Sequence, residues 1–136
     1  MGFVDDHAAD AGITPNPKKS ITPRIVVNDV QGCASFLKST FGAEGEVFAE
    51  RPTELVIGDS IVMISSLGER EQFPAFLYIY VDDTDATYQR AVAAGAEVIE
   101  APSDQFYGDR RAMVKDSYGN VYQIATPIPL GGSKDL

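Results

Sequence analysis

Histidine, cysteine and tryptophan are nearly absent from this sequence. It contains one histidine, one cysteine and no tryptophan among 136 residues. The single cysteine, Cys33, excludes an intrachain disulfide, and the expected compartment is the cytoplasm. Cys33 lies in a predicted helix and is expected to be a small buried side chain. The single histidine, His7, lies in an N-terminal segment without hydrophobic period, so no Ser–His or Cys–His catalytic pair is expected.

Basic residues are also few. Eleven Lys and Arg face twenty Asp and Glu, which gives a formal net charge of −9. This balance disfavours nucleic acids and anionic membranes as partners, because both bind through basic patches. It is compatible with a cationic ligand. No apolar run approaches the roughly 18–20 residues of a membrane helix, no signal peptide is recognisable, and the isolated glycines form no phosphate-binding loop.

The chain repeats itself at about half its length. The segments Val27-Asn28-Asp29 and Phe41-Gly42-Ala43-Glu44 recur as Val81-Asp82-Asp83 and Ala94-Gly95-Ala96-Glu97. Self-similarity at a fixed spacing predicts a duplicated structural unit. We therefore predict a single domain at 20–127, with modules at about 20–66 and 74–127, between a flexible N-terminal tail at 1–19 and a C-terminal tail at 128–136.

Each module is predicted to contain a strand, a helix and three further strands. Asp29 and Asp83 are suited to begin the helices, because a carboxylate accepts hydrogen bonds from free backbone N–H groups. Apolar residues then recur at helical spacing until Gly42 and Gly95, which are suited to end the helices. Strands are expected at 21–27, 46–50, 53–57 and 60–65, and again at 76–81, 97–101, 110–115 and 120–125. The expected fold class is α+β, with two βαβββ modules that form a cupped mixed sheet and helices on its outer face.

These motifs resemble a known superfamily. The segments VNDV…FGAE, YVDDTDATYQRAVAAGA and YGDRRAMVKDSYGNVYQIAT are similar to those of the glyoxalase/bleomycin-resistance/extradiol-dioxygenase superfamily, also called vicinal oxygen chelate. The resemblance covers about residues 20–127 and implies cupped sheets with one ligand site per cup, usually in a homodimer. Members include isomerases, dioxygenases, epimerases, thiol transferases and drug-sequestering proteins, so the fold does not give the function.

The resemblance also shows where metal ligands are missing. Metal-dependent members place His, Glu or Gln at positions that correspond to Thr22, Phe76, Val62 or Met63, and Gln123 of this sequence. Only Gln123 offers a ligand oxygen, whereas an enzymatic metal site needs about three protein ligands. We therefore place the chain in a metal-ligand-poor branch of the superfamily, and we expect no metal and no other cofactor.

Strand alternation predicts which side chains line the cup. In strand 76–81, Leu77, Ile79 and Val81 are expected to pack on the helix, which leaves three aromatic side chains facing the cup. Aromatic rings stack on a flat ligand, while arginine and glutamine orient its polar groups. An apolar patch at a dimer interface would produce the same pattern. The predicted ligand-binding residues are Arg24, Phe48, Phe76, Tyr78, Tyr80, Phe106, Tyr107, Arg110 and Gln123.

Two neighbouring arginines leave an alternative open. Alternation sends Arg110 and Arg111 to opposite faces of their strand, so that one of them is placed to bind an anionic group of a ligand. Ion pairs with Asp109 or Asp116 account for these side chains equally well.

Two main functions fit these features. The favoured one is metal-independent binding or sequestration of a hydrophobic or aromatic small molecule, including antibiotic resistance of the bleomycin-resistance type. The alternative is a glyoxalase-fold enzyme, an isomerase, epimerase or related lyase, in which Tyr78, Tyr80 or Glu54 would carry the acid–base chemistry. A third possible function is that of a regulatory or assembly module with a vestigial cup. No catalytic residue is assigned, and the expected partners are the small molecule and a second copy of the chain.

Overall fold

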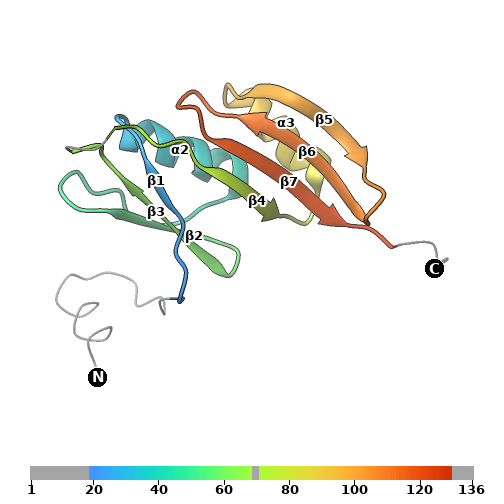
Figure 1. Cartoon of the computed structure of the whole chain (residues 1–136), viewed down its shortest axis with the longest axis horizontal. Coiled ribbons are helices and arrows are strands. Elements are labelled where there is room, and N and C mark those ends of the chain that lie inside the picture. The colour runs from blue at the N-terminus through green and yellow to red at the C-terminus, as the bar shows by residue number, and fades with distance from the viewer. Residues whose placement is uncertain (1–18, 69–70, 130–136) are drawn as a thin grey trace.

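Two modules of similar topology lie side by side along the long axis of the molecule (Figure 1). The computed structural model describes residues 19–68 and 71–129, so the predicted tails lie almost wholly outside the described residues. No helix within these ranges is long and apolar enough to cross a membrane. The elements are, in chain order, β1 (Arg24–Val26), α2 (Val30–Phe41), β2 (Thr53–Ile57), β3 (Ser60–Ser65), β4 (Phe76–Tyr80), α3 (Thr84–Ala93), β5 (Glu97–Asp104), β6 (Asp109–Lys115) and β7 (Val121–Pro127).

Each module forms its own sheet, and the two sheets share one connection pattern. The first sheet has the strand order β1-β3-β2 and the second has the order β4-β7-β6-β5. In both sheets the first strand of the module runs parallel to the last, and the remaining pairs are antiparallel. A duplicated unit predicts this pattern, and the α+β fold class is confirmed.

The first module has one strand fewer than predicted. Residues 46–50 form no strand, and the only pairing nearby is an isolated bridge between Glu44 and Val56. The predicted strand was wrong because the backbone N–H of Phe48 donates to the side chain of Thr53 at 2.9 Å. This local hydrogen bond closes a loop and takes the donor that a strand ladder would need. The first module is therefore βαββ, whereas the second has the full βαβββ order.

Both helices begin at the predicted aspartates. Asp29 accepts a hydrogen bond from the N–H of Gly32 at 2.9 Å, and Asp83 accepts one from the N–H of Ala86 at 3.1 Å. α2 ends at Gly42, whose φ of 69° is left-handed and carries little strain only for glycine. Both helices lie behind the sheets in Figure 1, which leaves the opposite sheet faces open.

The helix α2 joins the two modules into one hydrophobic core. The rings of Phe36 and Phe41 lie 5.5 and 5.7 Å from the ring of Tyr122, which belongs to the second sheet. All three side chains pack in or against a core drawn from both modules. Its fully buried apolar side chains include Ile25, Val27, Cys33, Leu37, Leu55, Ile64, Ala91, Val114, Tyr122 and Ile124.

Polar contacts fix both ends of α2 to the second module. At the N-terminal end, the hydroxyl of Tyr118 donates to Asp29 at 3.2 Å. At the C-terminal end, the guanidinium of Arg90 in α3 donates to the carbonyl of Thr40 at 3.1 Å. A Cβ atom on Gly32 would collide with the Tyr118 hydroxyl, so glycine is what allows this close approach. These contacts set how the two sheets lie relative to each other.

Candidate functional site

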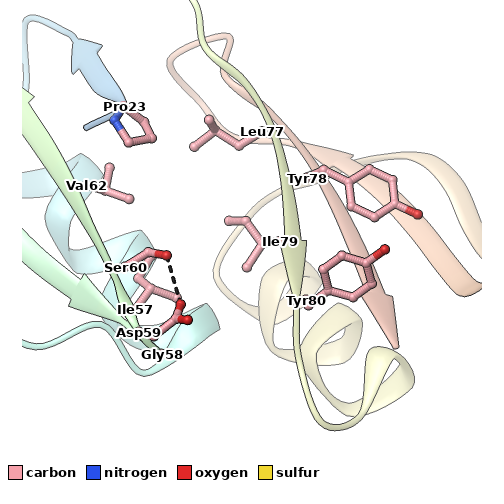
Figure 2. A pocket seen from close by; sticks show the side chains of 10 residues that line it. All are labelled: Pro23, Ile57, Gly58, Asp59, Ser60, Val62, Leu77, Tyr78, Ile79 and Tyr80. Carbon is pink, nitrogen blue, oxygen red and sulfur yellow. Dashed lines mark hydrogen bonds between the residues drawn. The ribbon is translucent and has the colours of Figure 1, made fainter. Parts of the chain in front are cut away.

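The open face of the second sheet carries aromatic side chains along β4. Phe76, Tyr78 and Tyr80 are 68%, 39% and 59% exposed, whereas Leu77 and Ile79 are half-buried against the core. Figure 2 shows the two tyrosine rings projecting from one side of β4 and the two aliphatic side chains from the other. The period-two alternation of a strand therefore places these rings on the face that the helices leave open.

A buried carboxylate connects the two tyrosines. Asp109, the first residue of β6, is 7% exposed, and its Oδ2 accepts the hydroxyl of Tyr78 at 2.5 Å and that of Tyr80 at 3.0 Å. The two ring centroids lie 5.4 Å apart with the ring planes inclined by 54°. Because both hydroxyl protons point to the same carboxylate oxygen, the phenol oxygens have only lone pairs left to offer a ligand.

An arginine and a glutamate extend this network toward β5. The Nη1 of Arg111 donates to the hydroxyl of Tyr107 at 3.0 Å, and its Nη2 pairs with Glu100. The Tyr107 hydroxyl also lies 3.4 Å from that of Tyr78, which joins the two halves of the network. The Nε of Arg111 is buried and has no hydrogen-bond partner among the described residues. We call Tyr78, Tyr80, Glu100, Tyr107, Asp109 and Arg111 the tyrosine cluster.

The surroundings of the two tyrosines keep the protons on their hydroxyls. Burial, followed by the hydrogen bond to Asp109, raises the pKa of Tyr78 above its ordinary value. For Tyr80 the hydrogen bond to Asp109 is the largest cause, and the pKa of this hydroxyl is also raised. A phenol with a raised pKa is a weaker acid, and its phenolate is scarcer at neutral pH. The cluster is therefore suited to contact a ligand and poorly suited to transfer protons.

A pocket lies beside β4 on the side away from the tyrosine rings (Figure 2). Its volume is about 250 Å³. Leu77 and Ile79 point into it from the second sheet, and Pro23, Val62 and the turn at 57–60 close it from the first. Pockets that enclose drug-sized ligands have volumes of about 300–1,000 Å³. This pocket therefore suits one ring or one arm of such a ligand.

Several predicted ligand-binding residues lie near the tyrosine cluster. Gln123 of β7 is paired in register with Tyr78, and Phe76 lies further along β4 on the same face. Phe106 is 94% exposed in the loop between β5 and β6, and its ring packs edge-on against that of Tyr107 with 5.3 Å between centroids. These side chains extend the aromatic surface on both sides of the cluster.

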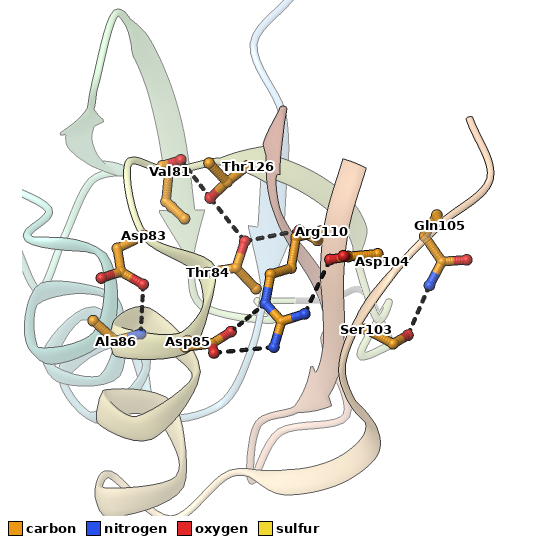
Figure 3. A network of polar contacts seen from close by, with 10 residues as sticks. All are labelled: Val81, Asp83, Thr84, Asp85, Ala86, Ser103, Asp104, Gln105, Arg110 and Thr126. Carbon is orange, nitrogen blue, oxygen red and sulfur yellow. Dashed lines mark hydrogen bonds and ion pairs between the residues drawn. The ribbon is translucent and has the colours of Figure 1, made fainter. Parts of the chain in front are cut away.

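Arg110 lies on the opposite face of β6, toward α3 (Figure 3). Its guanidinium pairs with Asp85 at 2.8 and 3.1 Å and with Asp104 at 3.0 Å. Hydrogen bonding from Arg110 lowers the pKa of Asp85. The acidic partners are therefore neither Asp109 nor Asp116, which the sequence suggested. Because Arg110 is engaged within the protein and faces the helix, we leave it out of the site.

Arg24 and Phe48 belong to the first module. The Nε of Arg24 donates to the hydroxyl of Ser65 at 2.7 Å, and the guanidinium carbon of Arg51 lies 4.0 Å from the ring centroid of Phe48. None of the contacts described for these side chains reaches the tyrosine cluster. They are placed to meet only a ligand that extends over the first module.

The sequence prediction missed Asp109, and of the two neighbouring arginines that it considered it assigned only Arg110 to the site. Asp109 and Arg111 lie on the tyrosine face because they are two residues apart on β6, and Arg111 is in register with Ala125, the partner of Tyr80 on β7. Period-two alternation alone would have placed the two on one face. The strand order that brings this face to the tyrosines is a property of tertiary pairing, which a single sequence does not display.

The described residues do not fit a divalent metal. They contain no group of three or more His, Cys, Asp or Glu side chains able to hold an ion. The register neighbours of Gln123 across the sheet are Tyr78 and Met113, and a thioether is a poor ligand for a hard cation. The metal that some superfamily members use has no matching donor set here.

Comparison with known proteins identifies relatives and solved structures of the same fold. Residues 19–124 match the model of the Glyoxalase/Bleomycin resistance protein/Dioxygenase superfamily. The uncharacterized protein Rv0887c of Mycobacterium tuberculosis is 27% identical, in an alignment that covers 83% of this chain and 77% of that protein. TioX from Micromonospora sp. ML1 superposes with a TM-score of 0.70 at 21% identity, covering 82% of this chain and 100% of TioX. A glyoxalase/bleomycin resistance protein/dioxygenase family enzyme from Burkholderia phytofirmans PsJN gives 0.68 at 22% identity, with 79% and 97% covered.

Proposed function

We propose that this chain, which belongs to the glyoxalase/bleomycin resistance protein/dioxygenase superfamily, binds a flat aromatic small molecule without metal and without chemical conversion. The observation that carries this proposal is the tyrosine cluster, in which two exposed rings are fixed by one buried carboxylate. Sequestration of a toxic compound, such as an antibiotic, is the role that suits such a site, and the cytoplasm is the compartment we propose.

The tyrosine rings supply most of the contact area in this proposal. Both side chains already hold one orientation because Asp109 accepts their hydroxyls, so little conformational freedom is lost when a ligand stacks on them. A ring-on-ring contact contributes about 0.5–1.5 kcal/mol beyond the area that it buries. Gln123 lies beside Tyr78 and is placed to orient a polar group of the ligand.

An enzyme of the same fold is the less well supported function. Its acid–base chemistry would fall to Tyr78, Tyr80 or a carboxylate such as Glu54, and the raised pKa values of the two tyrosines make them weak acids. Their hydroxyl protons are also already donated to Asp109. These features favour binding over proton transfer.

We also propose that the protein forms a homodimer. β5 is an edge strand of the second sheet, and one of its sides has no neighbouring strand in that sheet. Exposed edges and aromatic patches favour association with another surface. Light scattering should give the mass of two 14.7 kDa chains, and a monomer at micromolar concentration would contradict the proposal.

Fluorescence titration with acridine, a planar aromatic that is neutral above about pH 7, tests the binding function. We expect Tyr78→Ala to weaken binding by about 1–3 kcal/mol, the cost of losing a stacking contact and its buried area. Tyr78→Phe is the matched control, because it keeps the ring and removes only the hydroxyl. Unchanged affinity in Tyr78→Ala, with the fold intact by circular dichroism, would show that the open face of β4 is not the binding site.

A further inference from the structure

The tyrosine cluster carries an excess of negative charge. The cluster contains two carboxylates, those of Asp109 and Glu100, and one guanidinium, that of Arg111. Because both tyrosine hydroxyls donate to Asp109, it takes the acceptor role of an ionised carboxylate. Among the described residues, no ion pair reaches Asp109. Its charge is therefore balanced only by hydrogen bonds from neutral groups.

The two basic side chains nearest in sequence are already paired elsewhere. Arg111 is held by Glu100, and Arg110 is held by Asp85 and Asp104 on the other face of the sheet. Neither guanidinium is free to neutralise Asp109. The open face above the tyrosines thus combines a buried negative charge with two exposed aromatic rings.

Such a face has a definite chemical preference. Aromatic ring faces attract cations through their quadrupole, and the carboxylate that accepts the two tyrosine hydroxyls adds a charge attraction that partial burial strengthens. The phenol oxygens of Tyr78 and Tyr80 present lone pairs, which accept N–H groups and repel anions. All three features act in the same direction on a bound molecule.

We propose that the ligand of this site is an aromatic cation, a flat ring system that carries a protonated amine or amidine close to Tyr78 and Tyr80. This inference rests on the proposed binding function and names the class of ligand. Charge complementarity at the cluster, more than the net charge of the chain, selects the ligand.

Three probes with the same three-ring body test the inference: 9-aminoacridine as the cation, acridine as the neutral compound and acridine-9-carboxylate as the anion. We expect the cation to bind about tenfold tighter than the neutral probe and the anion to bind weakest. The preference for the cation over the neutral probe should decline as the salt concentration is raised. Equal affinity for the cation and the neutral probe would overturn the inference while leaving the binding function intact. Binding of no probe would count against both.

Substitutions at acidic positions locate the preference. Asp109→Asn should abolish it, whereas Glu44→Gln, which changes the net charge equally at an exposed position of the first module, should preserve it. If Glu44→Gln removes the preference instead, the preference does not arise at the tyrosine cluster and the inference is wrong. If Asp109→Asn does not fold, Arg111→Gln serves, since removing this guanidinium should strengthen binding of the cation and weaken binding of the anion. The opposite change would refute the proposal.

Discussion

Replacing Gly32 by alanine should destabilise the protein, although the same change stabilises most helices. Gly32 lies in the first turn of α2, where alanine is normally favoured by about 0.5–1 kcal/mol. Here the new Cβ would meet the hydroxyl of Tyr118 and the carboxylate of Asp29, which caps the helix. Overpacking of this kind costs about 1–3 kcal/mol, and displacement of the capping carboxylate adds about 1 kcal/mol. The net effect worked from these contacts is a loss of about 1–3 kcal/mol.

Thermal and urea unfolding measure this effect directly. A loss of 1 kcal/mol lowers the melting temperature by roughly 4 °C or more in a domain of about 100 residues. Tyr118→Phe removes the oxygen that the new methyl group would strike, so Gly32→Ala should cost less in that background. A Gly32→Ala variant that is more stable than the parent would refute the reasoning, because Tyr118 would then not lie over the helix. The contact between the two modules would have to be reconsidered as well.

Three further predictions follow from burial, charge and the donor set. The thiol of Cys33 is fully buried, and burial raises its pKa to about 12, so it should resist a disulfide reagent at about pH 8 and react fully in urea. Burial and the charge of Asp116 raise the pKa of Tyr122 above its value of about 10 in the unfolded chain. The stability that this residue contributes is therefore complete below about pH 10 and should fall as the pH rises further. Urea unfolding measured across that pH range checks the direction, and constant stability would contradict it. Elemental analysis should find no stoichiometric transition metal, because the described residues contain no group of metal-binding side chains. About one metal ion per chain would contradict this prediction.

Local patterns in the sequence predicted most of the fold. Asp29 and Asp83 begin the helices as expected, because capping depends on a residue and the three that follow it. The strand at Ser60–Ser65 has the predicted bounds, since it follows a Gly58-Asp59 turn and is rich in β-branched residues. The strand predicted at 46–50 failed because its composition allows a strand but its backbone donor is taken by a threonine side chain.

The site was less predictable than the fold. Period-two alternation was enough to place Tyr78 and Tyr80 on one face, since it depends only on neighbours in the chain. The union of these tyrosines with Asp109 depends on the order β4-β7-β6, in which residues about thirty positions apart meet. Pairing of that range is set by the whole core, so a single strand cannot reveal it. The same limit applies to Arg110, whose acidic partners come from α3 and from β5.

The register of β6 decides which charged side chains lie on the open face, and apolar residues set that register. Arg110 and Arg111 are adjacent, and either guanidinium is able to pair with an acidic side chain on its own side of the sheet. A slip of one residue in β6 would exchange them, but it would also turn the fully buried Ala112 and Val114 out to the open face. Lys115 would then have to enter the core, where an unpaired charge is costly. Apolar burial at these two positions therefore fixes which side of β6 carries Asp109, and with it the hydrogen bonds from Tyr78 and Tyr80 to its carboxylate.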